Sequence, residues 1–321
     1  MQKTKLRIVY MGTPDFAVYP LQKLLESKHT IVGVVTNPDK PAGRGQKLQE
    51  SAVKRYAMEK GLKILQPEKF KDEEFLKELK ALNADLNIVV AFKMLPEAVW
   101  GMPRLGTINL HASLLPHYRG AAPINRAIMD GQKMTGITTF LLERGMDTGR
   151  ILFRKEVGIG EDMTAGELHD ELMEKGGELL VETVDAMQQG EYPLLSQDEL
   201  LKGEEAKHAP KIFKEDMRIN WSADTDTVYN HIRGLSPFPT AWTELQHVET
   251  GETIVLKLFS VRKEITEPRE PGKIETDGKT YFHISTSDGL ILLDEIQLSG
   301  KKRMPVGDFL RGFSLGEYIL S

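Results

Sequence analysis

The chain has 321 residues, enough for two domains, and its 40% hydrophobic and 28% charged residues are the balance of an ordinary globular protein. It has no cysteine, which excludes disulfides, zinc–thiolate sites and cysteine nucleophiles. A net charge of −5 gives no global reason to expect nucleic acid as a partner, although local basic patches can still supply phosphate contacts.

Strands and helices alternate along the first third of the chain. Short β-branched apolar runs predict strands, and apolar residues at helical spacing predict the helices between them. The expected strands are 5–12, 30–38, 62–67 and 85–96, and the expected helices are 14–27, 51–61 and 73–83. This alternation predicts a mostly parallel, Rossmann-like sheet with helices on both faces. The N-terminus lacks the apolar stretch of a signal peptide, so we expect a cytoplasmic protein with no membrane segment.

The pattern changes after residue 134. Two strand-like runs within 135–157 flank the turn ERGMDTG and predict a hairpin, and a long amphipathic helix is expected over 164–190. Residues 191–207 are polar and aperiodic, as in a linker. We therefore expect one α/β domain over residues 1–190 and a second domain over 208–321.

The C-terminal region is predicted to be mostly β. One helix over 225–235 ends at the proline-rich SPFP. About five strands follow at hairpin spacing, within 241–246, 253–264, 271–287 and 289–300. This pattern predicts a small β-barrel of the OB type.

The strongest candidate site is NLHASLLP, residues 109–116. In a strand, Asn109 and His111 share a face because side chains alternate, and the bend at SLLP places them at a strand end, where ligands of open α/β sheets bind. Either residue alone would more often be structural. Asp147, on the glycine-flanked turn, can reach the imidazole from another strand and favour its protonated form.

These three side chains together suggest acyl chemistry without a covalent intermediate. An amide and an imidazolium can donate to a developing oxyanion, and the carboxylate supports the imidazolium. No serine nucleophile motif competes, and the eight histidines lack metal-ligand spacing, so we expect no metal.

With its flanking sequence, this site resembles the folate-dependent formyltransferases. NLHASLLPHYRGAAPI at 109–124 and GMDTG at 145–149 form a highly specific motif. GTPDFA at 12–17, NPDKPAGRGQKL at 37–48, VVAFKMLP at 89–96 and the extra C-terminal domain extend the resemblance over nearly the whole chain. The resemblance implies a transferase that moves the formyl group of 10-formyltetrahydrofolate to the α-amine of methionine on initiator tRNA, in support of translation initiation.

The family resemblance also assigns roles to individual residues. It makes Asn109, His111 and Asp147 the catalytic residues. It places eight residues in the folate site, Phe92, Lys93, Met94, Leu95, Ser113, Leu114, Leu115 and Pro116. Lys93 departs from the family pattern, in which a glycine is expected. Because an α-amine titrates near neutrality, it needs no strong base, and the proton relay through Asp147, His111 or water stays open.

The resemblance implies a tRNA-binding role for one polar loop and one lysine of the C-terminal region. From composition alone, PDKPAGRGQKL at 38–48 is a flexible surface loop with ordinary charges. In the family the corresponding loop enters the acceptor arm of tRNA, which implies contacts from Lys40, Arg44 and Lys47. Lys211 is expected to face phosphates too, and we expect a monomer.

Three other interpretations compete with tRNA formylation. An amino-sugar nucleotide formyltransferase would share the catalytic domain and can also carry a C-terminal β domain. A nonenzymatic nucleic-acid-binding protein would not require Asn109, His111 and Asp147 together. A nicotinamide dehydrogenase is disfavoured because GTPDFA lacks the second and third glycines of the dinucleotide motif.

Overall fold

The computed structural model describes residues 5–42 and 47–320, and its internal contacts divide the chain into two units. The first comprises residues up to Gly120 together with Thr135–Val157 and His169–His208. The second comprises Ala121–Met134, Gly158–Leu168 and the chain from Ala209 onward. Two short segments of the expected N-terminal domain thus belong to the second unit.

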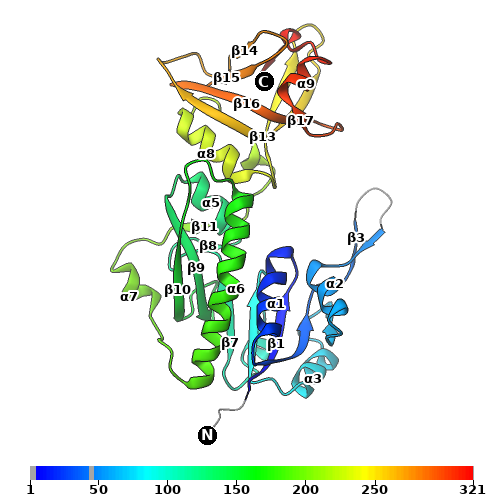
Figure 1. Ribbon diagram of the computed structural model, residues 1–321, viewed down its shortest axis with the longest axis vertical. Helices are drawn as coiled ribbons and strands as arrows, with labels where there is room; N and C mark the ends of the chain where they lie inside the picture. Colours follow the sequence, from blue (N-terminus) through cyan, green and yellow to red (C-terminus); the bar gives the residue numbers. More distant parts are fainter. Residues whose placement is uncertain (1–4, 43–46, 321) are drawn as a thin grey trace. The chain divides into compact units, whose positions relative to one another are not determined.

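A seven-stranded sheet forms the centre of the first unit (Figure 1). Its order is β10 (Ile151–Gly158), β9 (Met134–Leu141), β7 (Thr107–His111), β6 (Leu86–Val90), β1 (Arg7–Gly12), β2 (Thr30–Val35) and β5 (Ile64–Leu65). The strands from β7 to β5 pair in parallel, whereas β9 runs antiparallel to β7. The parallel sheet with a hairpin at its edge confirms the Rossmann-like α/β prediction.

Helices cover the sheet because its strands are apolar on both sides. One core joins side chains of β1, β2 and β6 to α3 (Glu73–Ala81) and the short α4 (Glu97–Trp100). On the other face, α1 (Val18–Glu26) and α6 (Ala165–Gln189) lie side by side, and Gly177 leaves room for Tyr19. α2 (Ala52–Glu59) begins at Ser51, whose side chain accepts from Lys54 N.

Some short elements were absent from the sequence prediction. The expected loop after β2 forms an antiparallel ribbon of β3 (Lys40–Ala42) and β4 (Lys47–Gln49) on either side of residues outside the described part. The expected linker contains α7 (Gln197–Leu201) and leads to β11 (His208–Ala209), the partner of β8 (Arg119–Gly120).

The second unit is built around an antiparallel sheet that encloses one apolar core. The strand order is β14 (Ile274–Thr276), β15 (Phe282–Ser285), β16 (Gly289–Leu298), β13 (Thr253–Ile265), β12 (Ala241–His247) and β18 (Tyr318–Leu320), with β17 (Met304–Pro305) beside β16. α8 (Thr225–Leu235) and α9 (Val306–Leu310) contribute to the same core. A small barrel-like β domain is confirmed, and its assignment to the OB type stays a prediction.

Two segments from the first half of the chain complete this unit. In α5 (Pro123–Met129), the amide of Asn125 donates to Gly234 O of α8 at 2.7 Å. A Cβ at Gly234 would lie 2.7 Å from Met129 Cγ, so the two helices approach closely only because this residue is glycine.

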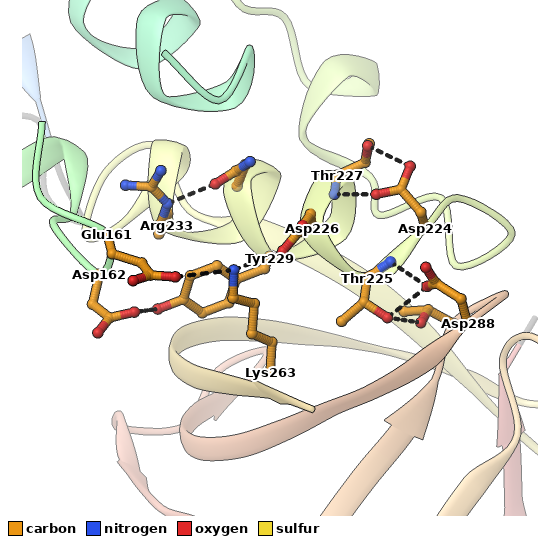
Figure 2. A network of polar contacts seen from close by, with 12 residues as sticks. Glu161, Asp162, Asp224, Thr225, Asp226, Thr227, Tyr229, Arg233, Lys263 and Asp288 are labelled. Atoms are coloured by element: carbon orange, nitrogen blue, oxygen red, sulfur yellow. Dashed lines mark hydrogen bonds and ion pairs between the residues drawn. The ribbon is translucent and has the colours of Figure 1, made fainter. Parts of the chain in front are cut away.

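The segment 158–168 is held to α8 by polar contacts (Figure 2). The hydroxyl of Tyr229 donates to Asp162 at 2.7 Å, and the buried guanidinium of Arg233 donates to Met163 O at 2.7 Å. Burial, and then the bond to Asp162, raises the pKa of Tyr229 well above its usual value, so the phenol stays protonated. Lys263 pairs with Asp226 at 2.6 Å and reaches Glu161 at 3.8 Å.

No helix of residues 5–42 and 47–320 combines the length and the apolar character needed to cross a membrane.

Candidate active site

Asn109 and His111 are the third and fifth residues of β7, the strand that lies between β6 and β9 in the sheet. The half-buried side-chain amide of Asn109 makes no hydrogen bond with any other residue that the structure describes. His111 is buried, and its Nε2 donates to Tyr118 O at 2.9 Å, since a carbonyl can only accept. One amide and one ring nitrogen, Nδ1, are therefore available to a ligand.

Asp147 reaches the same place from the turn that joins β9 to β10. Its Oδ2 lies 3.9 Å from His111 Nδ1, and the two side chains are 14% and 8% exposed. The same oxygen accepts from Gly120 N at 2.9 Å. The distance to His111 is too long for a hydrogen bond, so Nδ1 is open to a third group, as an acceptor in the neutral ring and as a donor in the imidazolium.

The glycines around Asp147 shape this turn. Gly145 has φ +113°, which favours glycine, and a Cβ at Gly149 would lie 1.7 Å from Leu141 O. Asp147 itself has φ +54°, an uncommon conformation for a residue with a side chain. GMDTG therefore specifies one backbone path that brings its carboxylate to β7.

The bend after β7 is fixed by a hydroxyl of the neighbouring strand. Thr138 Oγ1 donates to Ser113 O at 2.7 Å and accepts from Leu115 N at 3.1 Å. Ser113 Oγ donates to His117 O at 2.7 Å. The bend is thus held through its backbone, and the fully buried side chain of Leu115 packs with Phe140.

The eight residues expected in the folate site follow two adjacent parallel strands. Phe92 to Leu95 come after β6 and Ser113 to Pro116 after β7, so the structure brings both segments to neighbouring strand ends. Half of these side chains are committed to the fold, because Leu95, Ser113, Leu115 and Pro116 are buried. Met94 is 71% exposed, and Lys93 Nζ lies 5.2 Å from the centre of the Phe70 ring.

The expected tRNA-binding residues are distributed over both units. Lys40 is exposed on β3, and Lys47 begins β4. Arg44 lies outside the described residues. Lys211 belongs to the second unit, where its Nζ lies 5.4 Å from the Phe213 ring and Lys214 Nζ lies 5.9 Å from the Trp242 ring. Exposed lysines beside aromatic rings are a chemistry suited to RNA.

Sequence reasoning missed three residues that shape the site. Thr138 is an ordinary β-branched strand residue, and its role in the bend follows only from the pairing of β9 with β7. Arg119 and Gln197 are joined by a hydrogen bond of 2.9 Å behind Asp147. Arg119 lies within the motif at 109–124, and for Gln197 the available signal was SQDE at 196–199, a typical helix start within the expected linker.

The residues that the structure describes contain no group of three or more histidine, aspartate and glutamate side chains that could hold a metal ion. The site therefore offers an amide, an imidazole and a carboxylate as its chemical groups.

Comparison with known proteins identifies the family. The model of the formyl transferase family matches residues 5–184, and the model of the formyl transferase C-terminal domain matches residues 211–314. The chain is 52% identical over 318 residues to methionyl-tRNA formyltransferase of Bacteroides fragilis, covering 99% of this chain and 98% of that protein. It is 54% identical over 316 residues to the protein of that name from Phocaeicola vulgatus, covering 98% and 97% of the two chains.

Solved structures share the fold at lower identity. HypX from Aquifex aeolicus in complex with tetrahydrofolic acid matches with a TM-score of 0.64 and 19% identity, over 96% of this chain and 48% of that one. The sugar 3N-formyl transferase WlaRD matches with a TM-score of 0.65 and 19% identity, over 93% of this chain and 100% of that one. From the two family models and the full-length relatives together, it follows that the chain belongs to the formyl transferase family.

Proposed function

We propose that this protein transfers the formyl group of 10-formyltetrahydrofolate to the α-amine of methionyl initiator tRNA. The observation that carries the proposal is the meeting of Asn109, His111 and Asp147 in a chain about half identical, over its full length, to methionyl-tRNA formyltransferases. By supplying formylated initiator tRNA, the reaction would support translation initiation in the cytoplasm.

Asn109 and His111 would stabilise the charge that develops on the formyl oxygen when the amine attacks. The Asn109 amide has no competing partner among the described residues, and His111 Nδ1 is free to donate while Nε2 is held by Tyr118 O. Donors that are fixed before the reaction need not reorganise during it, which is why they lower the barrier.

Asp147 would favour the positively charged form of His111. With Nε2 already donating, a second ring proton resides on Nδ1, 3.9 Å from a carboxylate oxygen. When the ring carries both protons, its positive charge would face this carboxylate, and the imidazolium is a stronger donor than the neutral ring.

Folate would lie beside the strand ends of β6 and β7, the usual ligand position in an open α/β sheet. The reduced cosubstrate carries the formyl group on a nitrogen. The bond between the formyl carbon and this nitrogen breaks as the amide bond of formylmethionine forms. Leu95, Ser113, Leu115 and Pro116 would contact it through their backbone, because their side chains are buried. The exposed Met94 offers an apolar side chain at the same edge.

The acceptor can be tested directly against its nearest rival. Radiolabelled formyl transfer is measured in parallel to initiator methionyl-tRNA, elongator methionyl-tRNA and an amino-sugar nucleotide. We expect transfer to the initiator tRNA and at most weak transfer to the other two. Efficient transfer to the sugar alone would assign the protein to the amino-sugar branch, and no transfer to any amine would favour a nonenzymatic binding role.

A further inference from the structure

Gln197 is a buried polar residue close to the proposed catalytic carboxylate, although it comes from a segment that the sequence presents as a linker. It lies at the start of α7, and only 3% of it is exposed. A glutamine this deeply buried is retained only if both ends of its amide are satisfied.

Both ends of this amide form hydrogen bonds with residues around the candidate active site. Nε2 donates to Asp147 O at 2.9 Å and to Gly149 O at 2.7 Å. Oε1 accepts from Arg119 Nε at 2.9 Å. Because a guanidinium can only donate and a carbonyl can only accept, the orientation of the amide is determined by its partners. Gln197 therefore uses both of its donor hydrogens on the turn that carries Asp147.

That turn needs external support. Asp147 has φ +54°, a left-handed conformation that residues with a Cβ adopt uncommonly. Its carbonyl is held by Gln197 and its carboxylate by Gly120 N at 2.9 Å. Without the first of these bonds the turn can relax, and the carboxylate would move relative to His111.

We propose that Gln197 is a positioning residue that fixes the Asp147 carboxylate beside His111. Arg119 takes part in this positioning, because it donates to Gln197 and so orients it, while the next residue, Gly120, donates to the Asp147 carboxylate. Two successive residues of β8 thus hold Asp147 from two sides, one directly and one through Gln197. The inference rests on the proposed function, since it assumes that Asp147 acts in formyl transfer.

The test starts from Gln197→Glu, which keeps the size and the acceptor for Arg119 but loses both donors to the turn. We expect its single-turnover rate of formyl transfer to fall about tenfold to a hundredfold, as for a displaced catalytic group, while the Kd values for folate and tRNA change less than twofold. Gln132→Glu is the matched control, because Gln132 also donates to a backbone carbonyl, Asp130 O, in a turn outside the site. Its rate should equal that of the unmodified protein.

A double-mutant cycle separates positioning from a general loss of structure. If Gln197 acts through Asp147, then Gln197→Glu should add almost nothing in an Asp147→Asn background, because the positioned charge is already absent. Independent, multiplicative losses in the double variant would overturn the proposal. So would an unchanged rate in Gln197→Glu. If thermal unfolding shows that this variant fails to fold, the same cycle is run with Gln197→Met, which preserves the volume without a buried charge.

The two hypotheses fail in different ways. The formyl acceptor is identified by assays on the unmodified protein. The positioning role of Gln197 is tested by the ratio of the variant's single-turnover rate to that of the unmodified protein. If the unmodified protein formylates only an amino-sugar nucleotide, the proposed function is wrong, and the ratio is then measured with that acceptor.

Discussion

His111 illustrates how one side chain can serve the fold and leave a functional atom free. Its Nε2 is bonded to Tyr118 O, and its Nδ1 faces Asp147 without a hydrogen bond to it. We predict that His111→Ala and Asn109→Ala each lower the single-turnover rate by about two to three orders of magnitude, the effect of removing a donor to an oxyanion. Folate affinity, measured by calorimetry, should be nearly unchanged. Near-normal rates in both variants would remove these residues from the chemistry.

The charge of Asp147 can be separated from its shape. Asp147→Asn keeps an oxygen that can accept from Gly120 N but removes the negative charge beside His111. We predict a loss of about a hundredfold or more in single-turnover rate, within the range for acid–base groups, with a melting temperature close to that of the unmodified protein. A rate within twofold of normal would show that the carboxylate has no electrostatic role.

At the residue scale, sequence could predict the groups that lie on a repeating geometry. Asn109 and His111 follow from the alternation of strand side chains, and Asp147 from its glycine-flanked turn. Gln197 could not be found in this way, because its partners are 50 and 48 residues away and its burial arises only when α7 packs on the turn. The catalytic roles themselves stay predictions until they are measured.

At the scale of elements, a histidine of α8 is expected to make the stability of the second unit depend on pH. Burial lowers the pKa of His231, the nearby charge of Arg126 lowers it further, and Met217 O and Asp216 oppose the shift. The unfolded chain then binds a proton more tightly than the folded one. Stability is therefore present above the usual histidine pKa, about 6.5, and is lost as the pH falls below it.

We predict that His231→Gln flattens the fall in unfolding free energy between about pH 7 and pH 5. Urea unfolding at several pH values measures this slope. His208→Gln serves as a control, because His208 is exposed and its replacement should leave the slope unchanged. An equal slope in His231→Gln and the unmodified protein would contradict the assignment.

The β3–β4 ribbon is the element expected to contact tRNA. We predict that Arg44→Ala strongly lowers formyl transfer to initiator tRNA. Slow hydrolysis of the folate cosubstrate should stay intact, because the expected role of Arg44 is to bind tRNA and hydrolysis needs no tRNA. Transfer should also weaken with added salt, in proportion to the phosphates contacted. Rates that ignore both salt and the substitution would indicate a small amine as acceptor.

Elements were predictable where a periodic pattern was long, and not where packing decides. The strands β1, β2 and β6 are near-continuous apolar runs, and the helices α1, α6 and α8 have apolar residues at helical spacing. The ribbon and α7 are short and polar, so their formation depends on neighbours. In α7, Gln197 bonds to Arg119, Asp147 O and Gly149 O, partners that no local pattern encodes.

At the scale of the whole molecule, the two units share the first half of the chain. A chain ending at Gly203 loses α8, the partner of α5 and of the segment 158–168. We predict that it still binds folate but has no measurable affinity for initiator tRNA, and that it melts at a lower temperature than the full chain because polar and apolar groups of these segments lose their partners. Filter binding, calorimetry and thermal unfolding measure the three quantities. Unaltered tRNA binding would contradict the expected role of residues 208–321.

The interleaving also sets a condition for recombining such proteins. Because the second unit takes Ala121–Met134 and Gly158–Leu168 from within the first half of the chain, a chimera joined at one point near residue 208 would unite a foreign barrel with native α5. Asn125 would then face a helix that did not evolve with it, and Gly166, beside Pro237, would meet an unrelated loop. A transplant that exchanges all three segments preserves these contacts. The compact unit that contains the C-terminal barrel is therefore discontinuous in the sequence.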